Sequence, residues 1–350
     1  METKRFHIDP EHMDIDKIRE AAKIIREGGL VAFPTETVYG LGGDAKDPGA
    51  AKAIYAAKGR PSDNPLIVHI CDYRQLEEIA VDLPKTAKKL ADAFWPGPMT
   101  MIVKKNSKIP LETTGGLETV AVRFPSHPVA MALIRESGCM IAAPSANTSG
   151  RPSPTKADHV WGDLKGKIQG LIDGGEVEIG LESTIIDLTE EVPMILRPGY
   201  INQEMLEEVI GEVRVDPAVL GTENVHVKPK APGMRYKHYA PKGNLKIVTG
   251  DEEKVVAAIE KMAGEDEASD RKVGIIATKE TKERYTKGVV LCIGDRSNED
   301  EIAHNLFAVL REMDDMGMET IYSEDFSTPR IGQAIMNRLL KAAAHQVIEA

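Results

Sequence analysis

The chain has 350 residues, of which 42% are hydrophobic and 28% are charged, a balance typical of globular proteins long enough for two domains. Its formal net charge of −11 opposes a broad, sequence-independent grip on a nucleic-acid backbone, because each phosphate contact needs a Lys or Arg. Cys71, Cys139 and Cys292 form no CxxC pair, so neither a disulfide framework nor a zinc site is expected. The sequence also lacks an apolar signal segment and any run of 18 apolar residues, so we expect a cytoplasmic protein without membrane contact.

The first half alternates helical and extended patterns. Apolar residues at helical spacing predict a helix over 14–27, followed by a strand over 30–35, a glycine-rich turn over 38–43, a helix over 49–57 and a strand over 65–70. Further strands are predicted over 99–105, 119–125, 140–147, 183–188 and 194–199, and further helices over 84–93, 128–137 and 202–210. Together these elements predict a twisted mixed sheet covered by helices.

A composition break separates this half from the rest of the chain. Residues 228–246 contain six Lys or Arg, three prolines and no acid, which is typical of a linker. Beyond it, strands at 245–249, 273–277, 288–294 and 320–324 alternate with helices at 252–262, 300–316 and 331–343. We therefore predict a catalytic domain over 1–215, a linker over 216–244 and a Rossmann-like parallel α/β domain over 245–350. That domain has neither GxGxxG nor a Walker A motif, so neither NAD nor flavin is expected.

Two short motifs offer groups that bind anions. Lys58 and Arg60 flank a glycine after a predicted helix, and Asn64 follows four residues later. Two cations beside a flexible glycine suit a phosphate, although solvated loop charges are the plainer interpretation of a KxR tripeptide. Ser145 and Asn147 end an apolar strand and project to the same side, where α/β sheets bind ligands, although a turn-capping pair is equally compatible.

Predicted strands also carry isolated polar residues. Arg123 falls opposite the packed face of its strand, and its planar fork would suit a carboxylate or a phosphate. A ligand-binding role is equally open for Arg197, His69 and Ser183. The alternative for each of them is an exposed or purely structural role. No GxSxG, HExxH or Walker A motif occurs, so the residues alone indicate an anion or nucleotide site without covalent or zinc chemistry.

Taken together, the segments FPTETVYGLG, KGR with SDNPLIVHI, PSANTSGRPSPT, STIID, ILRPG and GMRYKHYAP resemble the threonylcarbamoyl-AMP synthase family in its long, two-domain form. The resemblance covers nearly the whole chain. It implies a YrdC-like twisted sheet with a concave cavity, followed by a Rossmann-like domain. It also implies that L-threonine, bicarbonate or CO2, and ATP give threonylcarbamoyl-AMP and pyrophosphate for a tRNA modification completed by a separate transferase complex. Mg2+ would accompany ATP, with no protein ligand assigned, and direct tRNA contact would be weak.

The resemblance also assigns roles to individual residues. It implies that Lys58, Arg60, Ser145 and Asn147 act in catalysis. The implied threonine site consists of Thr37, His69, Arg123, Ala143 and Ser183. The implied ATP site consists of Arg60, Asn64, Thr119, Ser145, Ser153, Arg197 and, from the linker, Tyr236 as part of a lid over the nucleotide. The competing interpretations are a non-catalytic module for tRNA or double-stranded RNA and a carbamoyl transferase like the hydrogenase maturation factors.

Overall fold

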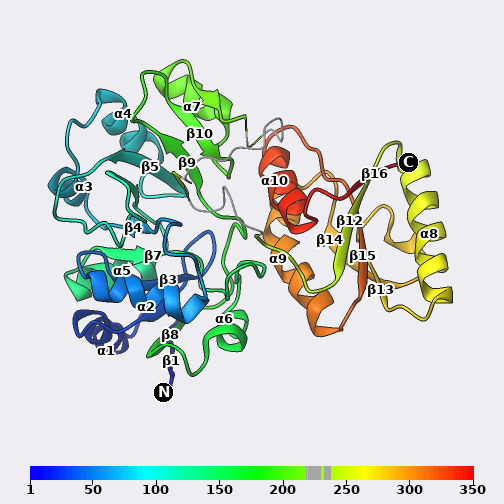
Figure 1. Ribbon diagram of the computed structural model, residues 1–350, viewed down its shortest axis with the longest axis horizontal. Helices are drawn as coiled ribbons and strands as arrows, with labels where there is room; N and C mark the ends of the chain where they lie inside the picture. Colours follow the sequence, from blue (N-terminus) through cyan, green and yellow to red (C-terminus); the bar gives the residue numbers. More distant parts are fainter. Residues whose placement is uncertain (218, 220–229, 232–237) are drawn as a thin grey trace. The chain divides into compact units, whose positions relative to one another are not determined.

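The computed structural model describes residues 1–217, 219, 230, 231 and 238–350, which fold into two compact units (Figure 1). The first unit contains residues 1–149, 154–178 and the described part of the chain from 182 to 231. The second contains residues 238–350 together with the short segments 150–153 and 179–181, which the sequence-based boundary at 215 does not anticipate. Most of the predicted linker, including Tyr236, lies outside the described residues.

The first unit is built on one mixed sheet of eleven strands in the order β1-β8-β2-β3-β7-β4-β6-β5-β9-β10-β11. The strands are β1 (Lys4–His7), β2 (Val31–Phe33), β3 (Gly40–Asp44), β4 (Ile67–His69), β5 (Met99–Lys104), β6 (Thr119–Arg123), β7 (Ile141–Ala143), β8 (Gly170–Asp173), β9 (Thr184–Asp187), β10 (Met194–Arg197) and β11 (Arg214–Val215). The helices are α1 (Ile15–Arg26), α2 (Pro48–Lys58), α3 (Tyr73–Ile79), α4 (Lys85–Phe94), α5 (Pro128–Ser137), α6 (Ala157–Leu164) and α7 (Gln203–Ile210).

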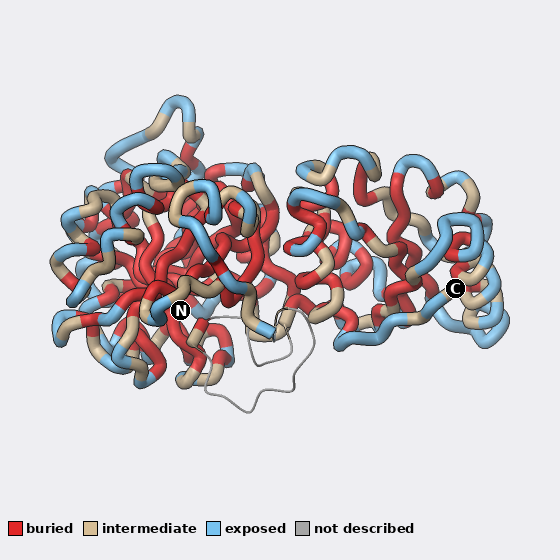
Figure 2. Tube along the Cα trace, turned by 90° about the horizontal axis from the view of Figure 1, so that it is seen from above, coloured by how far each residue is buried: buried red, intermediate tan, exposed pale blue. Residues whose placement is uncertain are grey.

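Side-chain alternation along the strands gives this sheet two packed faces. Ala32, Val120 and Val122 belong to the larger core, whereas Val31 and Phe33 pack with helices α1 and α5 in a second core on the opposite face. A third, smaller apolar cluster includes Ile67, Ile102, Ala121, Ile185 and Leu196. Figure 2 shows buried residues running through the middle of each unit.

Local chemistry fixes the ends of the helices that lead to the site. The Asp47 side chain accepts a hydrogen bond from the Gly49 amide and caps α2, with Pro48 in the first turn. The same helix ends at Gly59 in the left-handed conformation, with φ of 62°. Asp72 and Gln75 form a reciprocal capping box at the start of α3.

The glycine-rich segment predicted as a turn over 38–43 is instead largely strand β3, so that prediction was wrong. A Cβ on Gly42 would lie 2.6 Å from Ile141 Cγ2 and 2.8 Å from the Phe33 ring. Glycine is therefore needed here because neighbouring side chains approach the backbone closely. The sequence interpretation also passes over seven elements that the structure contains: β1, α3, α6, β8, β11, the 3-10 turn at Lys282–Arg284 and β16.

The second unit has a five-stranded, wholly parallel sheet in the order β14-β13-β15-β12-β16. Its elements are β12 (Asn244–Thr249), α8 (Glu252–Ala268), β13 (Val273–Thr278), a 3-10 turn (Lys282–Arg284), β14 (Val289–Gly294), α9 (Glu299–Asp315), β15 (Thr320–Glu324), α10 (Gly332–Ala342) and β16 (Val347–Glu349). The predicted fold class, a mixed sheet followed by a parallel Rossmann-like domain, is confirmed. Arg311 donates from Nε and Nη2 to the carbonyl of Pro152, which ties segment 150–153 to α9.

Candidate active site

Strand register gathers the predicted site residues into one row across the sheet of the first unit. His69 on β4 pairs with Arg123 on β6, and Arg123 pairs with Thr100 on β5. Thr100 in turn pairs with Ile185 on β9, which pairs with Arg197 on β10. Directly paired residues point to the same side of a sheet, so His69, Arg123, Thr100 and Arg197 share one face.

Arg123 is the central charge of this row and is only 4% exposed. Its Nη1 donates to Thr37 Oγ1 at 2.7 Å, and Thr37 lies on the loop between β2 and β3. Its Nη2 lies 2.7 Å from Oε1 of Glu36, a carboxylate that is itself 3% exposed. Nε and Nη2 of Arg123 have no hydrogen-bond partner among the residues described, because the contact with Glu36 misses hydrogen-bond alignment. Arg123 is therefore neither exposed nor saturated, and it retains donors for an anion.

His69 is a neutral member of the row. Its Nδ1–H donates to the carbonyl of Ile67 at 3.1 Å, and its ring lies edge-on to Phe33. Burial, helped by the nearby charge of Arg123, lowers the pKa of His69 to about 3. The imidazole is thus uncharged at neutral pH and contributes shape and a ring nitrogen rather than a positive charge.

This pKa predicts an acid sensitivity of the first unit. Between pH 6.5 and about 3 the unfolded chain binds a proton at His69 that the folded unit does not, so lowering the pH destabilises the fold by up to about 1.4 kcal/mol per pH unit. Between pH 7 and pH 4.5, the free energy of unfolding should fall by about 2 kcal/mol less in His69→Gln than in the wild type. Urea titrations followed by tryptophan fluorescence would measure it, since Trp95 and Trp161 both lie in the first unit. Equal pH slopes in both proteins would contradict the assignment.

Ser183 and Arg197 extend the row beyond Thr100. Thr100 Oγ1 and Ser183 Oγ lie 2.7 Å apart, and Arg197 contacts Ser183 twice, from Nε to the carbonyl at 3.0 Å and from Nη2 to Oγ at 3.2 Å. Ala143 ends β7 and pairs with Ile67, two residue pairs along the sheet from the pair of His69 with Ile141. The structure thus brings together Thr37, His69, Arg123, Ala143 and Ser183, the five residues predicted for threonine.

The KGR motif and the SAN loop lie against each other. Lys58, which is 2% exposed, donates from Nζ to the carbonyls of Ser145 and Asn147, so the interpretation as a solvated loop charge was wrong. The hydroxyl of Ser145 donates to Asn147 Oδ1 at 2.5 Å, which confirms that the two side chains project together. Gly59 supplies a left-handed cap, and a Cβ there would meet nothing within 4 Å, so its role is backbone conformation.

The remaining residues predicted for ATP lie in three places. Arg60 is 8% exposed and donates to the carbonyls of Asn64 and Pro65 at 3.2 and 3.1 Å, while Oδ1 of Asn64 is buried without a partner among the described residues. Thr119 begins β6, the strand that ends at Arg123. Ser153 is fully buried in segment 150–153 of the second unit, and Tyr236 lies outside the part of the chain that the structure describes.

Two family models match the chain, one described as telomere recombination over residues 23–199 and one as the C-terminal domain of threonylcarbamoyl-AMP synthase over residues 201–344. A threonylcarbamoyl-AMP synthase of Pyrococcus abyssi is 50% identical and covers 97% of both chains. That of Bacillus subtilis is 47% identical and covers 99% of this chain and 100% of its own. The chain belongs to the threonylcarbamoyl-AMP synthase family. A crystal structure of P. abyssi Sua5 complexed with L-threonine has a TM-score of 0.94 at 48% identity, covering 99% of this chain and 100% of that one.

Membership in the threonylcarbamoyl-AMP synthase family confirms the resemblance stated from the motifs. The roles of individual residues stay predictions. The sequence interpretation missed Glu36 and Thr100, although Glu36 stands inside the FPTETVYG segment. An acid directly after a buried apolar strand, between two threonines, could have identified it, since carboxylates are rarely buried without a partner.

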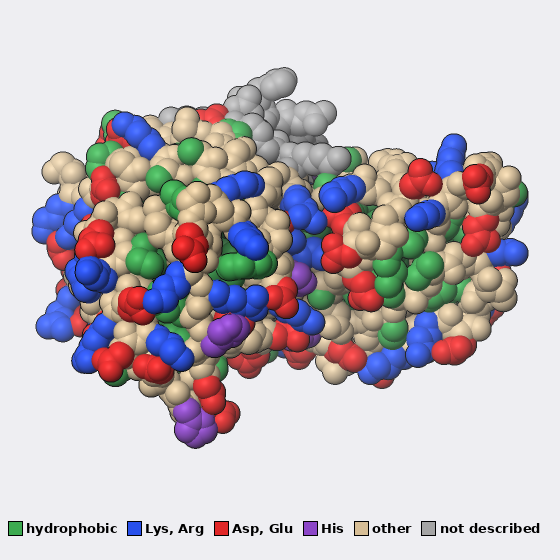
Figure 3. All heavy atoms as spheres, turned by 90° about the horizontal axis from the view of Figure 1, so that it is seen from below, with side chains coloured by type: hydrophobic (Ala, Val, Ile, Leu, Met, Phe, Trp, Pro, Cys, Tyr) green, Lys and Arg blue, Asp and Glu red, His purple; other side chains and the backbone are tan. Residues whose placement is uncertain are grey.

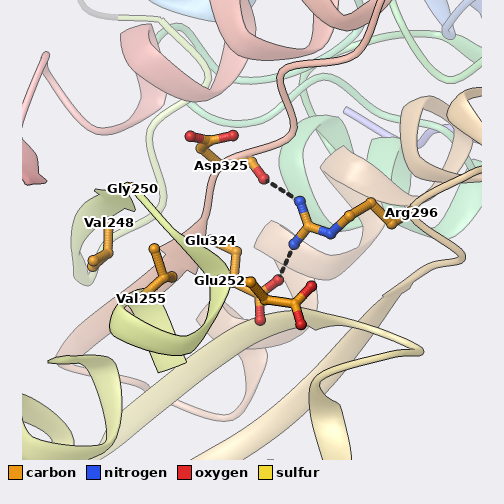
Figure 4. A pocket seen from close by; sticks show the side chains of 7 residues that line it. All are labelled: Val248, Gly250, Glu252, Val255, Arg296, Glu324 and Asp325. Atoms are coloured by element: carbon orange, nitrogen blue, oxygen red, sulfur yellow. Dashed lines mark hydrogen bonds and ion pairs between the residues drawn. The ribbon is translucent and has the colours of Figure 1, made fainter. Parts of the chain in front are cut away.

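The synthase's second unit has a cavity of about 160 Å³ at the carboxyl ends of its strands (Figure 4). Its charged lining consists of Arg296 and the acids Glu252, Glu324 and Asp325. Arg296 is held by Glu324 and by the carbonyl of Asp325, and Glu324 also accepts from the Tyr285 hydroxyl at 2.8 Å. Three acids against one arginine disfavour nucleotide phosphates, which agrees with the missing glycine-rich motifs.

Residues 1–217, 219, 230, 231 and 238–350 contain no gathering of three His, Cys, Asp or Glu side chains that could ligate a metal. Within the same residues, no helix combines the length and the apolar character needed to cross a membrane.

Proposed function

We propose that this chain forms threonylcarbamoyl-AMP from L-threonine, bicarbonate and ATP on the face of the sheet around Arg123. The observation that carries this proposal is the buried guanidinium of Arg123, which has donors left over and is bonded to the Thr37 hydroxyl. Arg123 pairs across the sheet with Thr100, whose hydroxyl contacts that of Ser183. A guanidinium binds the carboxylate of an amino acid with paired hydrogen bonds, and nearby hydroxyls suit the threonine side chain.

The ATP subsite would lie around Arg60, Ser145, Asn147 and Arg197, beside the threonine subsite. Lys58 donates hydrogen bonds to carbonyls of the SAN loop, and Arg60 donates one to the carbonyl of Asn64. We therefore assign both residues first to positioning these loops. Mg2+ would enter on the phosphates of ATP, where it supplies charge neutralisation. This fits a metal that usually keeps most of its waters and takes few protein ligands.

The reaction needs shelter from water because its carbamate intermediate is labile. The threonine nitrogen forms a bond to CO2, and a carbamate oxygen then attacks the α-phosphorus of ATP and expels pyrophosphate. Burial of Arg123, Thr37, His69 and Ser183 to below 5% exposure supports a site where solvent is excluded and the reactants are held in line.

The test is an omission experiment. Purified protein with ATP, Mg2+, bicarbonate and L-threonine should release pyrophosphate and give an adenylate of the expected mass, and leaving out threonine, bicarbonate or ATP should abolish both. Pyrophosphate release that ignores threonine would contradict the proposal. That result would favour the non-catalytic RNA-binding alternative. Figure 3 argues against this alternative, because it shows a face on which acidic and basic side chains are interspersed rather than a basic surface.

A further inference from the structure

Glu36 is a buried carboxylate that pairs with Arg123 but accepts no hydrogen bond within the part of the chain that the structure describes. It lies between Thr35 and Thr37 on the loop joining β2 to β3, and it is 3% exposed. Neither carboxylate oxygen accepts a hydrogen bond from the residues described. Arg123 Nη2 is close enough for an ion pair, at 2.7 Å from Oε1, but the N–H does not point at that oxygen.

Such an arrangement is costly to the folded protein, because the ion pair compensates the lost hydration of the two charges only in part while their remaining donors and acceptors stay without hydrogen bonds. Other ion pairs in the chain are satisfied differently. The equally buried Glu324, for example, accepts from the hydroxyls of Thr281 and Tyr285 as well as pairing with Arg296. Unused donors on Arg123 and unused acceptors on Glu36 therefore point to a ligand that supplies both kinds of partner.

A zwitterion has that character. In an α-amino acid a carboxylate and an ammonium group are separated by one carbon, and here a guanidinium and a carboxylate face each other at contact distance. The amino-acid carboxylate would accept from Nε and Nη2 of Arg123, and its ammonium would donate to the oxygens of Glu36. We propose that Glu36 binds the α-ammonium group of the amino-acid substrate and takes the proton that carbamate formation releases. This inference rests on the synthase activity proposed above.

The proton balance shows why a base is needed at this position. Overall, R–NH3⁺ and HCO3⁻ give R–NH–COO⁻, H2O and one H⁺. A nitrogen–carbon bond forms, and the carbon–oxygen bond of bicarbonate breaks as its hydroxyl leaves as water. The remaining proton passes to Glu36, the group that already holds the nitrogen, and returns to solvent when the product leaves.

The groups around Glu36 are less suited than Glu36 itself to accept the proton that carbamate formation releases. Arg123 is permanently protonated and has no acceptor. His127, at the start of α5, has its pKa lowered by burial, with the charge of Glu36 acting in the opposite direction, and its Nδ1 accepts from the Val129 amide at 3.3 Å. The neighbouring His69 is held neutral and donates from Nδ1 to the Ile67 carbonyl.

The kinetic test compares Glu36→Gln with the wild type. The amide keeps the shape and loses the basic oxygen, so kcat/KM for threonine at pH 7 should fall by about 10²- to 10⁴-fold, while KM for ATP stays within about threefold. Between pH 6.5 and 8.5 the variant should recover about tenfold per pH unit as free threonine amine accumulates, whereas the wild type should change little. Glu36→Asp should restore part of the activity at pH 7.

A binding test needs no turnover and separates recognition from catalysis. Calorimetry would compare L-threonine with 2,3-dihydroxybutanoate, in which a hydroxyl replaces the ammonium. The wild type should prefer threonine by at least about 30-fold, and Glu36→Gln should reduce that preference to within about threefold. Far-ultraviolet dichroism and tryptophan fluorescence would show that the variant is folded.

Three outcomes would overturn the inference. The first is a Glu36→Gln enzyme with kcat/KM within threefold of the wild type. The second is a loss of equal size at every pH. The third is wild-type protein that binds both ligands equally well. Wild-type protein without threonine-dependent pyrophosphate release would instead refute the proposed function itself, so the two failures are distinguishable.

Discussion

Arg123→Ala should abolish measurable threonine binding and lower kcat/KM for threonine by about 10³-fold, because the variant removes the guanidinium and leaves the Glu36 carboxylate buried and unpaired. The free energy of unfolding of the first unit should fall by about 3 to 5 kcal/mol for the same reason. Calorimetry with threonine and urea titrations followed by tryptophan fluorescence would measure the two effects.

A second substitution separates the two effects. Arg123→Ala combined with Glu36→Gln removes the unpaired charge, so stability should recover while threonine binding does not. Arg74→Ala is the matched control, since Arg74 is an exposed arginine that pairs with Asp72 at the start of α3, and it should change neither quantity. Threonine affinity preserved in Arg123→Ala would contradict the role assigned to Arg123.

Lys58→Met should lower kcat/KM for ATP by about 10²- to 10³-fold, because the buried ammonium group holds the carbonyls of Ser145 and Asn147 and thereby sets the shape of the predicted ATP subsite. Threonine affinity in the absence of ATP should stay within about fivefold, since Arg123 is held by Thr37 and Glu36 on the loop after β2. Steady-state kinetics and threonine calorimetry would distinguish the two substrates.

The control for Lys58 comes from the same helix. Lys52 on α2 is exposed and pairs only loosely with Glu112, at 3.5 Å, so Lys52→Met removes the same charge without disturbing a loop. It should leave both kinetic constants unchanged. If Lys58→Met lowered threonine affinity as strongly as the kcat/KM for ATP, the separation into two subsites would be wrong.

Periodicity predicted most of the strands of the sheet because their apolar runs are bounded by turns. The strand β3 was missed because its glycines are required by the packing of Phe33 and Ile141, a tertiary requirement that local propensity does not show. Short elements such as β1 were missed because four residues carry too weak a pattern.

The site was predictable as a set of residues and unpredictable as an arrangement. Motif resemblance named His69, Arg123 and Arg197, but only strand register placed them in one row, and register depends on pairings between distant segments. The same limit hid Glu36. Its burial and its contact with Arg123 arise when the loop after β2 packs beneath β6, far away along the chain.

The strand order of the first unit constrains how the protein is made on the ribosome. One edge of β2 is covered by β8, where Val31 pairs with Gly170, and one edge of β5 is covered by β9, where Met99 pairs with Thr184. At typical translation speeds β2 therefore waits on the order of ten seconds for its partner, with an open backbone edge. We expect conditions that slow elongation between residues 100 and 170 to prolong the exposure of this edge and to increase aggregation of the nascent chain.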